Sequence, residues 1–99
     1  MNSEIDRKIA VILVADVVGY SKHMERDENA TLKAYAECER ILKTCLKKYK
    51  GYVFNTAGDS ALAEFPSAFN AVECGVAFQN DIKKRNEWDK TEVKLEFRI

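Results

Sequence analysis

Two strand-like apolar runs, each followed by an aspartate, restrict most strongly how this chain can fold. The first, residues 9–15, is rich in β-branched side chains and stops at Asp16, and the second, residues 51–58, stops at Asp59. The first run is continuous in its apolar character, which predicts a central strand covered on both faces. A carboxylate at the end of a buried strand is costly unless a cation, hydrogen-bond donors or water receive it. Two such carboxylates on neighbouring strands favour a divalent ion, and Mg²⁺ if the other ligands are oxygens.

Helical repeats follow each of these runs. Over residues 29–49, apolar side chains recur every three or four positions, which predicts a long amphipathic helix, terminated near Gly51. Ser67 is suited to cap a second helix. The predicted apolar stripe of the first helix comprises Leu32, Tyr35, Cys38, Leu42, Cys45, Leu46 and Tyr49, and that of the second comprises Ala68, Ala71, Val72, Gly75, Phe78, Gln79 and Ile82.

Between the helices the sequence predicts a β-hairpin, with residues 52–56 and 61–65 as strands and Asp59 at its tip. Residues 92–99 alternate polar and apolar side chains, which predicts a half-exposed last strand. The order β-α-β-β-α-β is that of an α+β, ferredoxin-like sandwich, an antiparallel sheet with two helices on one face. In this arrangement Asp59 lies beside the end of the first strand, next to Asp16.

Composition limits the kinds of protein that this chain can be. Its 99 residues, 46% of them hydrophobic, indicate a single domain over residues 1–99. Sixteen basic residues balance sixteen acidic ones, so no long-range field gathers nucleic acid or an anionic membrane. The N-terminal residues form neither a signal peptide nor a transmembrane helix. Because the odd set Cys38, Cys45 and Cys74 lacks CxxC spacing, we expect reduced core thiols in a cytoplasmic protein.

Three motifs carry a family resemblance. They are the Asp-x-x-Gly-Tyr-Ser element that ends residues 7–21, the Gly-Asp element that ends residues 55–59, and the Glu-Phe-Pro-Ser-Ala element of residues 64–68. With this spacing, the chain from about residue 7 onwards resembles the first part of a class III adenylate/guanylate cyclase catalytic domain of the bacterial type. Each motif alone is weak, and the combination is fairly specific.

The resemblance implies that the ribose 3′-hydroxyl of a nucleoside triphosphate attacks the α-phosphate, which yields pyrophosphate and a 3′,5′-cyclic nucleotide. Asp16 and Asp59 would be the catalytic metal ligands for two Mg²⁺ or Mn²⁺ ions, with the carbonyl of Val17 assisting one ion. Family enzymes form head-to-tail homodimers with sites at the interface. The triphosphate would be lined by Val18, Gly19, Tyr20 and Ser21.

The chain also departs from the family pattern. Asn55 stands where adenylate cyclases commonly carry an adenine-selecting lysine; it is a candidate base contact without charge, which leaves the base open, with ATP favoured over GTP. Residues 97–99 end the sequence where family members continue into a half that carries the transition-state asparagine and arginine. Because a positioned cation contributes on the order of 10³ in phosphoryl-transfer rate, we expect this chain alone to be nearly inactive.

Other interpretations remain open. Asp16 also fits a helix N-cap, and Asp59 an ordinary turn residue. Residues 50–54 partly mimic an RNA-binding aromatic motif, but they open the second strand rather than the third, and the zero net charge argues against RNA. A stronger alternative is a catalytically silent cyclase-homology domain that binds nucleotide or a partner and regulates.

Overall fold

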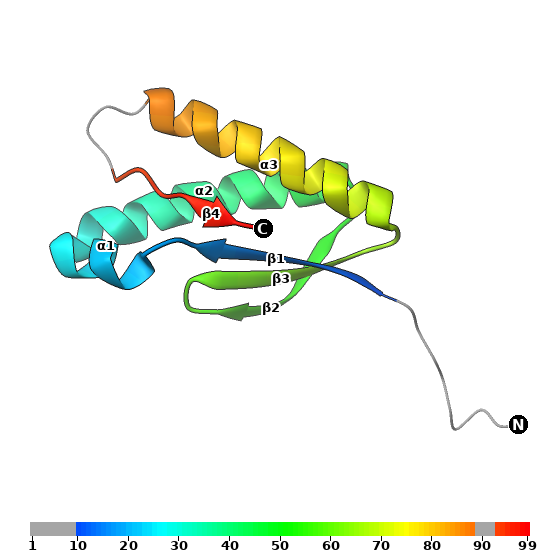
Figure 1. Cartoon of the computed structure of the whole chain (residues 1–99), viewed down its shortest axis with the longest axis horizontal. Helices are drawn as coiled ribbons and strands as arrows, with labels where there is room; N and C mark the ends of the chain where they lie inside the picture. The colour runs from blue at the N-terminus through cyan, green and yellow to red at the C-terminus, as the bar shows by residue number, and fades with distance from the viewer. Residues whose placement is uncertain (1–9, 89–92) are drawn as a thin grey trace, which may run out of the picture.

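The described part of the chain forms a four-stranded antiparallel sheet with its long helices on one face (Figure 1). A computed structural model describes residues 10–88 and 93–99, and the strand order is β2-β3-β1-β4. The predicted α+β, ferredoxin-like arrangement is confirmed, with one short helix added before the first long one. In chain order the elements are β1 (Val11–Val17), α1 (Tyr20–Arg26), α2 (Glu28–Lys48), β2 (Tyr52–Ala57), β3 (Ser60–Phe65), α3 (Ala68–Trp88) and β4 (Phe97–Arg98).

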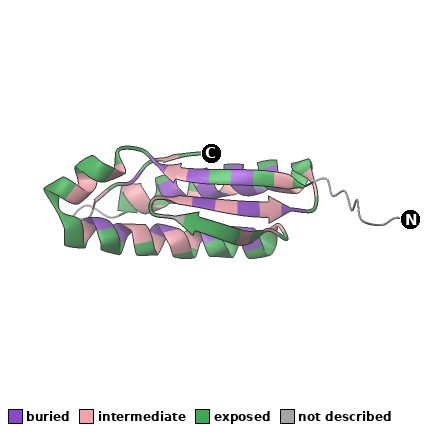
Figure 2. Ribbon diagram, turned by 90° about the horizontal axis from the view of Figure 1, so that it is seen from below, coloured by how far each residue is buried: buried purple, intermediate pink, exposed green. Residues whose placement is uncertain are grey.

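β1 lies inside the sheet, between β3 and β4, and is covered on one face only. Its burial alternates, with Leu13, Ala15 and Val17 buried under the helices (Figure 2). Ile12 and Val14 point the other way, and each is 43% exposed. The prediction that this strand is covered on both faces is therefore wrong for the described residues. The strand also continues through Asp16, so this aspartate lies within β1 and is not a helix N-cap; residue 9 lies outside the described ranges.

α2 begins and packs close to its predicted position. Asp27 caps it, because the Asp27 carboxylate accepts a hydrogen bond of 3.1 Å from the amide of Ala30. Leu32, predicted to be in the apolar stripe, is 44% exposed, since the buried face includes Thr31 and Ala34 instead. The buried residues of α2 are Thr31, Ala34, Cys38, Leu42, Cys45 and Leu46.

The end of α2 differs in detail from the expectation that Gly51 terminates it by its conformation. The left-handed residue is Lys50, with φ 65°, and the Gly51 amide then donates to the Leu46 carbonyl at 2.8 Å. Gly51 is needed for space, because a Cβ atom there would lie 2.5 Å from the Phe65 ring. The glycine therefore lets the chain pass close to β3.

The hairpin and α3 follow the predicted pattern with small changes. β2 and β3 pair around a tight turn in which Gly58 has φ 57°, and Asp59 follows it at the tip. Ser67 caps α3 by accepting the Asn70 amide at 3.1 Å. Ala68 and Val72 of the predicted stripe are exposed; the buried residues of α3 are Ala71, Cys74, Gly75, Phe78 and Ile82.

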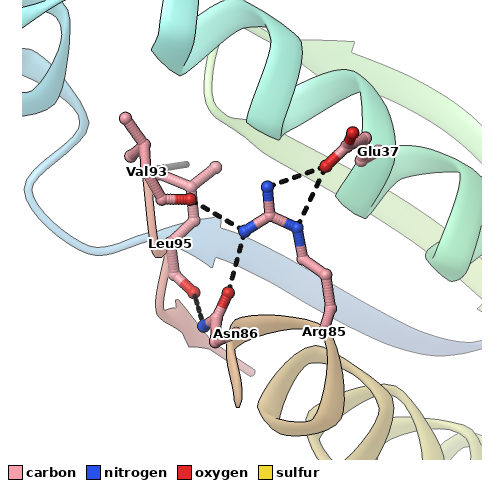
Figure 3. Close-up of polar contacts among 5 residues, drawn as sticks. All are labelled: Glu37, Arg85, Asn86, Val93 and Leu95. Carbon is pink, nitrogen blue, oxygen red and sulfur yellow. Dashed lines mark hydrogen bonds and ion pairs between the residues drawn. The ribbon is translucent and has the colours of Figure 1, made fainter. Parts of the chain in front are cut away.

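Side chains of α3 hold the extended segment that leads into β4 (Figure 3). Arg85 donates to the Val93 carbonyl at 2.8 Å, Asn86 to the Leu95 carbonyl at 2.9 Å, and Gln79 to the Phe97 carbonyl at 2.9 Å. These alternate carbonyls accept from side chains of a helix, and regular pairing with β1 is confined to Phe97–Arg98. The predicted alternation of burial is nevertheless present over residues 93–98, while residue 92 lies outside the described ranges.

Cys38, Cys45 and Cys74 are free and buried, as predicted for core thiols. Among the described residues, none of the helices has the length and apolar character needed to cross a lipid bilayer.

Candidate metal and nucleotide site

Asp16 lies at the centre of a row of three side chains on the open face of the sheet. Sheet register places Ser60 of β3 on one side of Asp16 and Arg98 of β4 on the other. The Ser60 hydroxyl donates to Oδ1 of Asp16 at 3.2 Å, and a guanidinium nitrogen of Arg98 lies 3.4 Å from Oδ2. Asp16 is therefore a partly exposed carboxylate, 31% accessible, with a partner at each oxygen.

Asp59 lies next to Asp16 along the same end of the sheet. Its main-chain carbonyl accepts a hydrogen bond of 3.1 Å from the amide of Val17, and Ser60, the next residue, is paired with Asp16. The pKa of Tyr35 on α2 is raised mainly by burial, then by Glu39, with smaller contributions that include the charge of Asp59. The structure thus brings the two aspartates together from segments far apart in the sequence.

The donor set of this corner is suited to a hard divalent cation. Two carboxylates and the carbonyl of Val17 offer only oxygen atoms, which Mg²⁺ and Mn²⁺ prefer. No cluster of three or more His, Cys, Asp or Glu side chains that could hold a metal occurs among the described residues. This is compatible with Mg²⁺, because that ion is usually held by one or two carboxylates while water and substrate phosphates complete its shell.

The segment after β1 brings backbone amides to the same corner. Gly19 precedes α1 with φ 65°, and the first hydrogen bond of the helix joins the His23 amide to the Gly19 carbonyl at 3.2 Å. The amides of Tyr20 and Ser21 therefore have no acceptor within the helix and are suited to an anion. The amide of Val18 is already used, since it donates to the Glu96 carbonyl at 2.8 Å.

The side chains of Tyr20 and Asn55, two of the predicted nucleotide contacts, lie on different elements of the structure. The ring of Tyr20 packs edge-on against Tyr35, with centroids 6.0 Å apart, so its side chain joins α1 to α2. Asn55 is exposed on β2, opposite Leu62 of β3. Asn55 thus shares the open sheet face with Asp16, two strands away.

Sequence reasoning missed two members of this site, Ser60 and Arg98. Ser60 directly follows Asp59, so the hairpin prediction contained the signal needed to find it. Arg98 lies in the last strand, which was predicted to be half exposed, but its pairing with Asp16 depends on the register between β1 and β4, which no local pattern specifies.

Comparison with known proteins gives a consistent assignment. No family model matches the chain. The chain is 45% identical over 83 residues to putative adenylate cyclase 3 of Rhizobium meliloti (strain 1021), a match that covers 83% of this chain and 14% of that protein.

Several solved structures that share this fold are named as cyclases. The adenylate/guanylate cyclase/hydrolase from Silicibacter pomeroyi is 27% identical, with a TM-score of 0.72 over 91% of this chain and 56% of that one. The guanylyl cyclase Cya2 has a TM-score of 0.76 at 21% identity, over 87% of this chain and 49% of that one. The adenylyl cyclase CyaB from P. aeruginosa has a TM-score of 0.72 at 21% identity, over 88% and 51%. The chain thus spans about half the length of these structures. Its resemblance to the first part of a class III adenylate/guanylate cyclase catalytic domain is confirmed.

Proposed function

We propose that this chain contributes to a nucleotidyl cyclase domain that converts a nucleoside triphosphate, with ATP favoured over GTP, into a 3′,5′-cyclic nucleotide and pyrophosphate. The observation that carries the proposal is the meeting of Asp16 and Asp59 at one corner of the sheet, joined by the bond between the Val17 amide and the Asp59 carbonyl. The amides at the start of α1 lie in the segment that directly follows β1. Carboxylates for metal ions and amides for phosphate are the two elements that such a reaction needs.

In this proposal Asp16, Asp59 and the carbonyl of Val17 would hold two Mg²⁺ or Mn²⁺ ions. When bound, such ions activate the attacking hydroxyl and neutralise charge on the phosphates. Ser60 orients Asp16, because its hydroxyl fixes one carboxylate oxygen at 3.2 Å. The triphosphate would lie along residues 18–21, chiefly against the amides of Gly19, Tyr20 and Ser21.

The open face around Asp16 supports a homodimer as the working form. Ile12 and Val14 lie on the same face of β1 as Asp16, and both are exposed to a degree that is unusual for the middle of a sheet. A second subunit over this face would bury them and would supply the remaining walls of the site. We accordingly propose that the 99-residue chain by itself is nearly inactive.

A catalytically silent domain that binds nucleotide is the second candidate. The exposed, uncharged Asn55 favours it, because the base then lacks a charged partner at this position. The two candidates differ in turnover and share the metal site.

The test is a titration of the chain with Mn²⁺ and ATP or GTP, followed by calorimetry, on the wild type and on the variants D16N and D59N. Each variant removes a charge without removing volume, and we expect metal-dependent nucleotide binding to weaken by about tenfold or more. D27N is the matched control, since asparagine caps a helix as well as aspartate does. Equal binding by all four proteins would contradict the proposed site.

Turnover separates the two candidates. Formation of cyclic nucleotide by the isolated chain would contradict the expected inactivity. Formation of cyclic nucleotide by a longer form of the protein, lost in D16N, would exclude the silent domain.

A further inference from the structure

Arg98 is held opposite Asp16 by the sheet itself. The two residues are directly paired in the antiparallel ladder between β1 and β4, so their Cβ atoms lie on the same face of the sheet. A guanidinium nitrogen of Arg98 lies 3.4 Å from Oδ2 of Asp16. The contact therefore follows from register, which places the two side chains beside each other on one face of the sheet.

The main chain around Arg98 is fixed from two sides. The Gln79 side chain of α3 donates to the carbonyl of Phe97 at 2.9 Å, and the Val18 amide donates to the carbonyl of Glu96 at 2.8 Å. These bonds come from a helix on one side and from the end of β1 on the other. The main chain at Arg98 consequently cannot move away from Asp16 without breaking these hydrogen bonds.

A cation that binds Asp16 meets this arginine. One carboxylate oxygen is engaged by the Ser60 hydroxyl, which carries no charge, whereas the other is engaged by a full positive charge. The Arg98 side chain is 71% exposed and that of Asp16 is 31% exposed, so the pair is weak enough to exchange with solvent and ions. Two cations at one carboxylate repel each other, and the ion pair must be given up when a metal ion arrives.

We propose that Arg98 is an internal counter-ion of Asp16 that competes with the divalent metal ion and thereby sets the metal affinity of the site. Arg98 acts through Asp16 and is a positioning residue in this role. The inference rests on the proposed function, because it assumes that Asp16 binds the metal.

The experiment measures Mn²⁺ binding without nucleotide, by electron paramagnetic resonance or calorimetry at low ionic strength. For R98Q we expect the dissociation constant of Mn²⁺ to fall about two- to fivefold, the factor that corresponds to an exposed ion pair. R98K restores the charge and should bind Mn²⁺ close to the wild-type affinity. R40Q is the matched control, since it removes one exposed arginine from α2, on the opposite face of the sheet, and should leave the affinity unchanged.

Salt provides a second readout that a purely structural role would not move. The difference between R98Q and the wild type should shrink as ionic strength rises, because the competing charge is exposed and screened. Arg98 is highly exposed, so R98Q is expected to fold, and circular dichroism checks this.

The outcomes separate the inference from the proposed function. Unchanged Mn²⁺ binding in D16N would overturn both. Loss of Mn²⁺ binding in D16N, together with unchanged or weaker binding in R98Q, would overturn the role of Arg98 alone. Tighter binding in both R98Q and R40Q would show a general charge effect and would also overturn it.

Discussion

The guanidinium of Arg85 donates to the Glu37 carboxylate through two nitrogens, at 3.2 and 2.8 Å, and so joins α3 to α2 (Figure 3). The Arg85 side chain is only 9% exposed, and it also bonds to Asn86 and to the Val93 carbonyl. R85M leaves these acceptors without their donor, so we expect the free energy of unfolding to fall by about 2–4 kcal/mol. Urea denaturation measures the change. R85K keeps the charge but lacks the planar fork, and it should lie between R85M and the wild type; a loss below about 0.5 kcal/mol in R85M would contradict this.

Lys50 and Gly51 should respond to substitution in opposite directions. K50G relieves a left-handed conformation that costs a side-chain-bearing residue about 1–2 kcal/mol, partly offset by the entropy of glycine, so we expect a gain of up to about 1 kcal/mol. G51A introduces a Cβ atom 2.5 Å from the Phe65 ring and should cost about 1–3 kcal/mol. Thermal denaturation of the two variants measures both changes in stability. A K50G variant that is less stable than the wild type would contradict the expected gain.

The two faces of β1 should tolerate substitution very differently. Ile12 and Val14 are exposed, so I12T and V14T are each expected to change stability by no more than about 0.5 kcal/mol. L13A, on the buried face between them, removes packing and should cost about 2–5 kcal/mol. Urea midpoints of the three variants provide the comparison. Equal losses at residues 12 and 13 would mean that the outer face is covered in solution.

Two buried thiols should make the protein less stable in alkali. Burial is the main reason that the pKa of Cys38 is raised from 9.0 to about 11, and burial together with Asp81 raises the pKa of Cys45 to about 11. At pH values well below 9 these thiols are neutral in both the folded and the unfolded chain. Between about pH 9 and 11 only the unfolded chain releases the protons, so the free energy of unfolding should fall as pH rises.

The double variant C38A/C45A tests this assignment. Its free energy of unfolding should decline less steeply than that of the wild type between pH 9 and 11, because two of the titrating groups are gone. Identical slopes in the two proteins would assign the alkaline loss to other groups.

Local patterns predicted the elements well and the environment of their faces less well. The helix expected over residues 29–49 spans Glu28–Lys48, because helical period and end signals are properties of neighbouring residues. The apolar run of β1 could not reveal its open face, since Ile12 and Val14 would look the same under a second layer of helices. At the end of α2, the preference of glycine for left-handed backbone pointed to Gly51, whereas close packing against Phe65 is what requires a glycine there.

The candidate site also has a part that the sequence could predict and a part that it could not. Topology alone predicted that Asp16 and Asp59 lie side by side, and the register Asp16↔Ser60 bears this out; their role as metal ligands stays a prediction. The contact of Arg98 with Asp16 could not be predicted, because it depends on a pairing of only two residues between β1 and β4.

The way in which α3 holds the segment before β4 has a consequence for the dynamics of the chain. The carbonyls of Val93, Leu95 and Phe97 depend on three helix side chains, so this segment belongs to the cooperative unit of α3 more than to that of the sheet. Partial opening of that unit would release the Glu96 carbonyl from the amide of Val18. Hydrogen exchange at the Val18 amide, which lies beside the candidate site, would therefore report how often this unit of α3 opens.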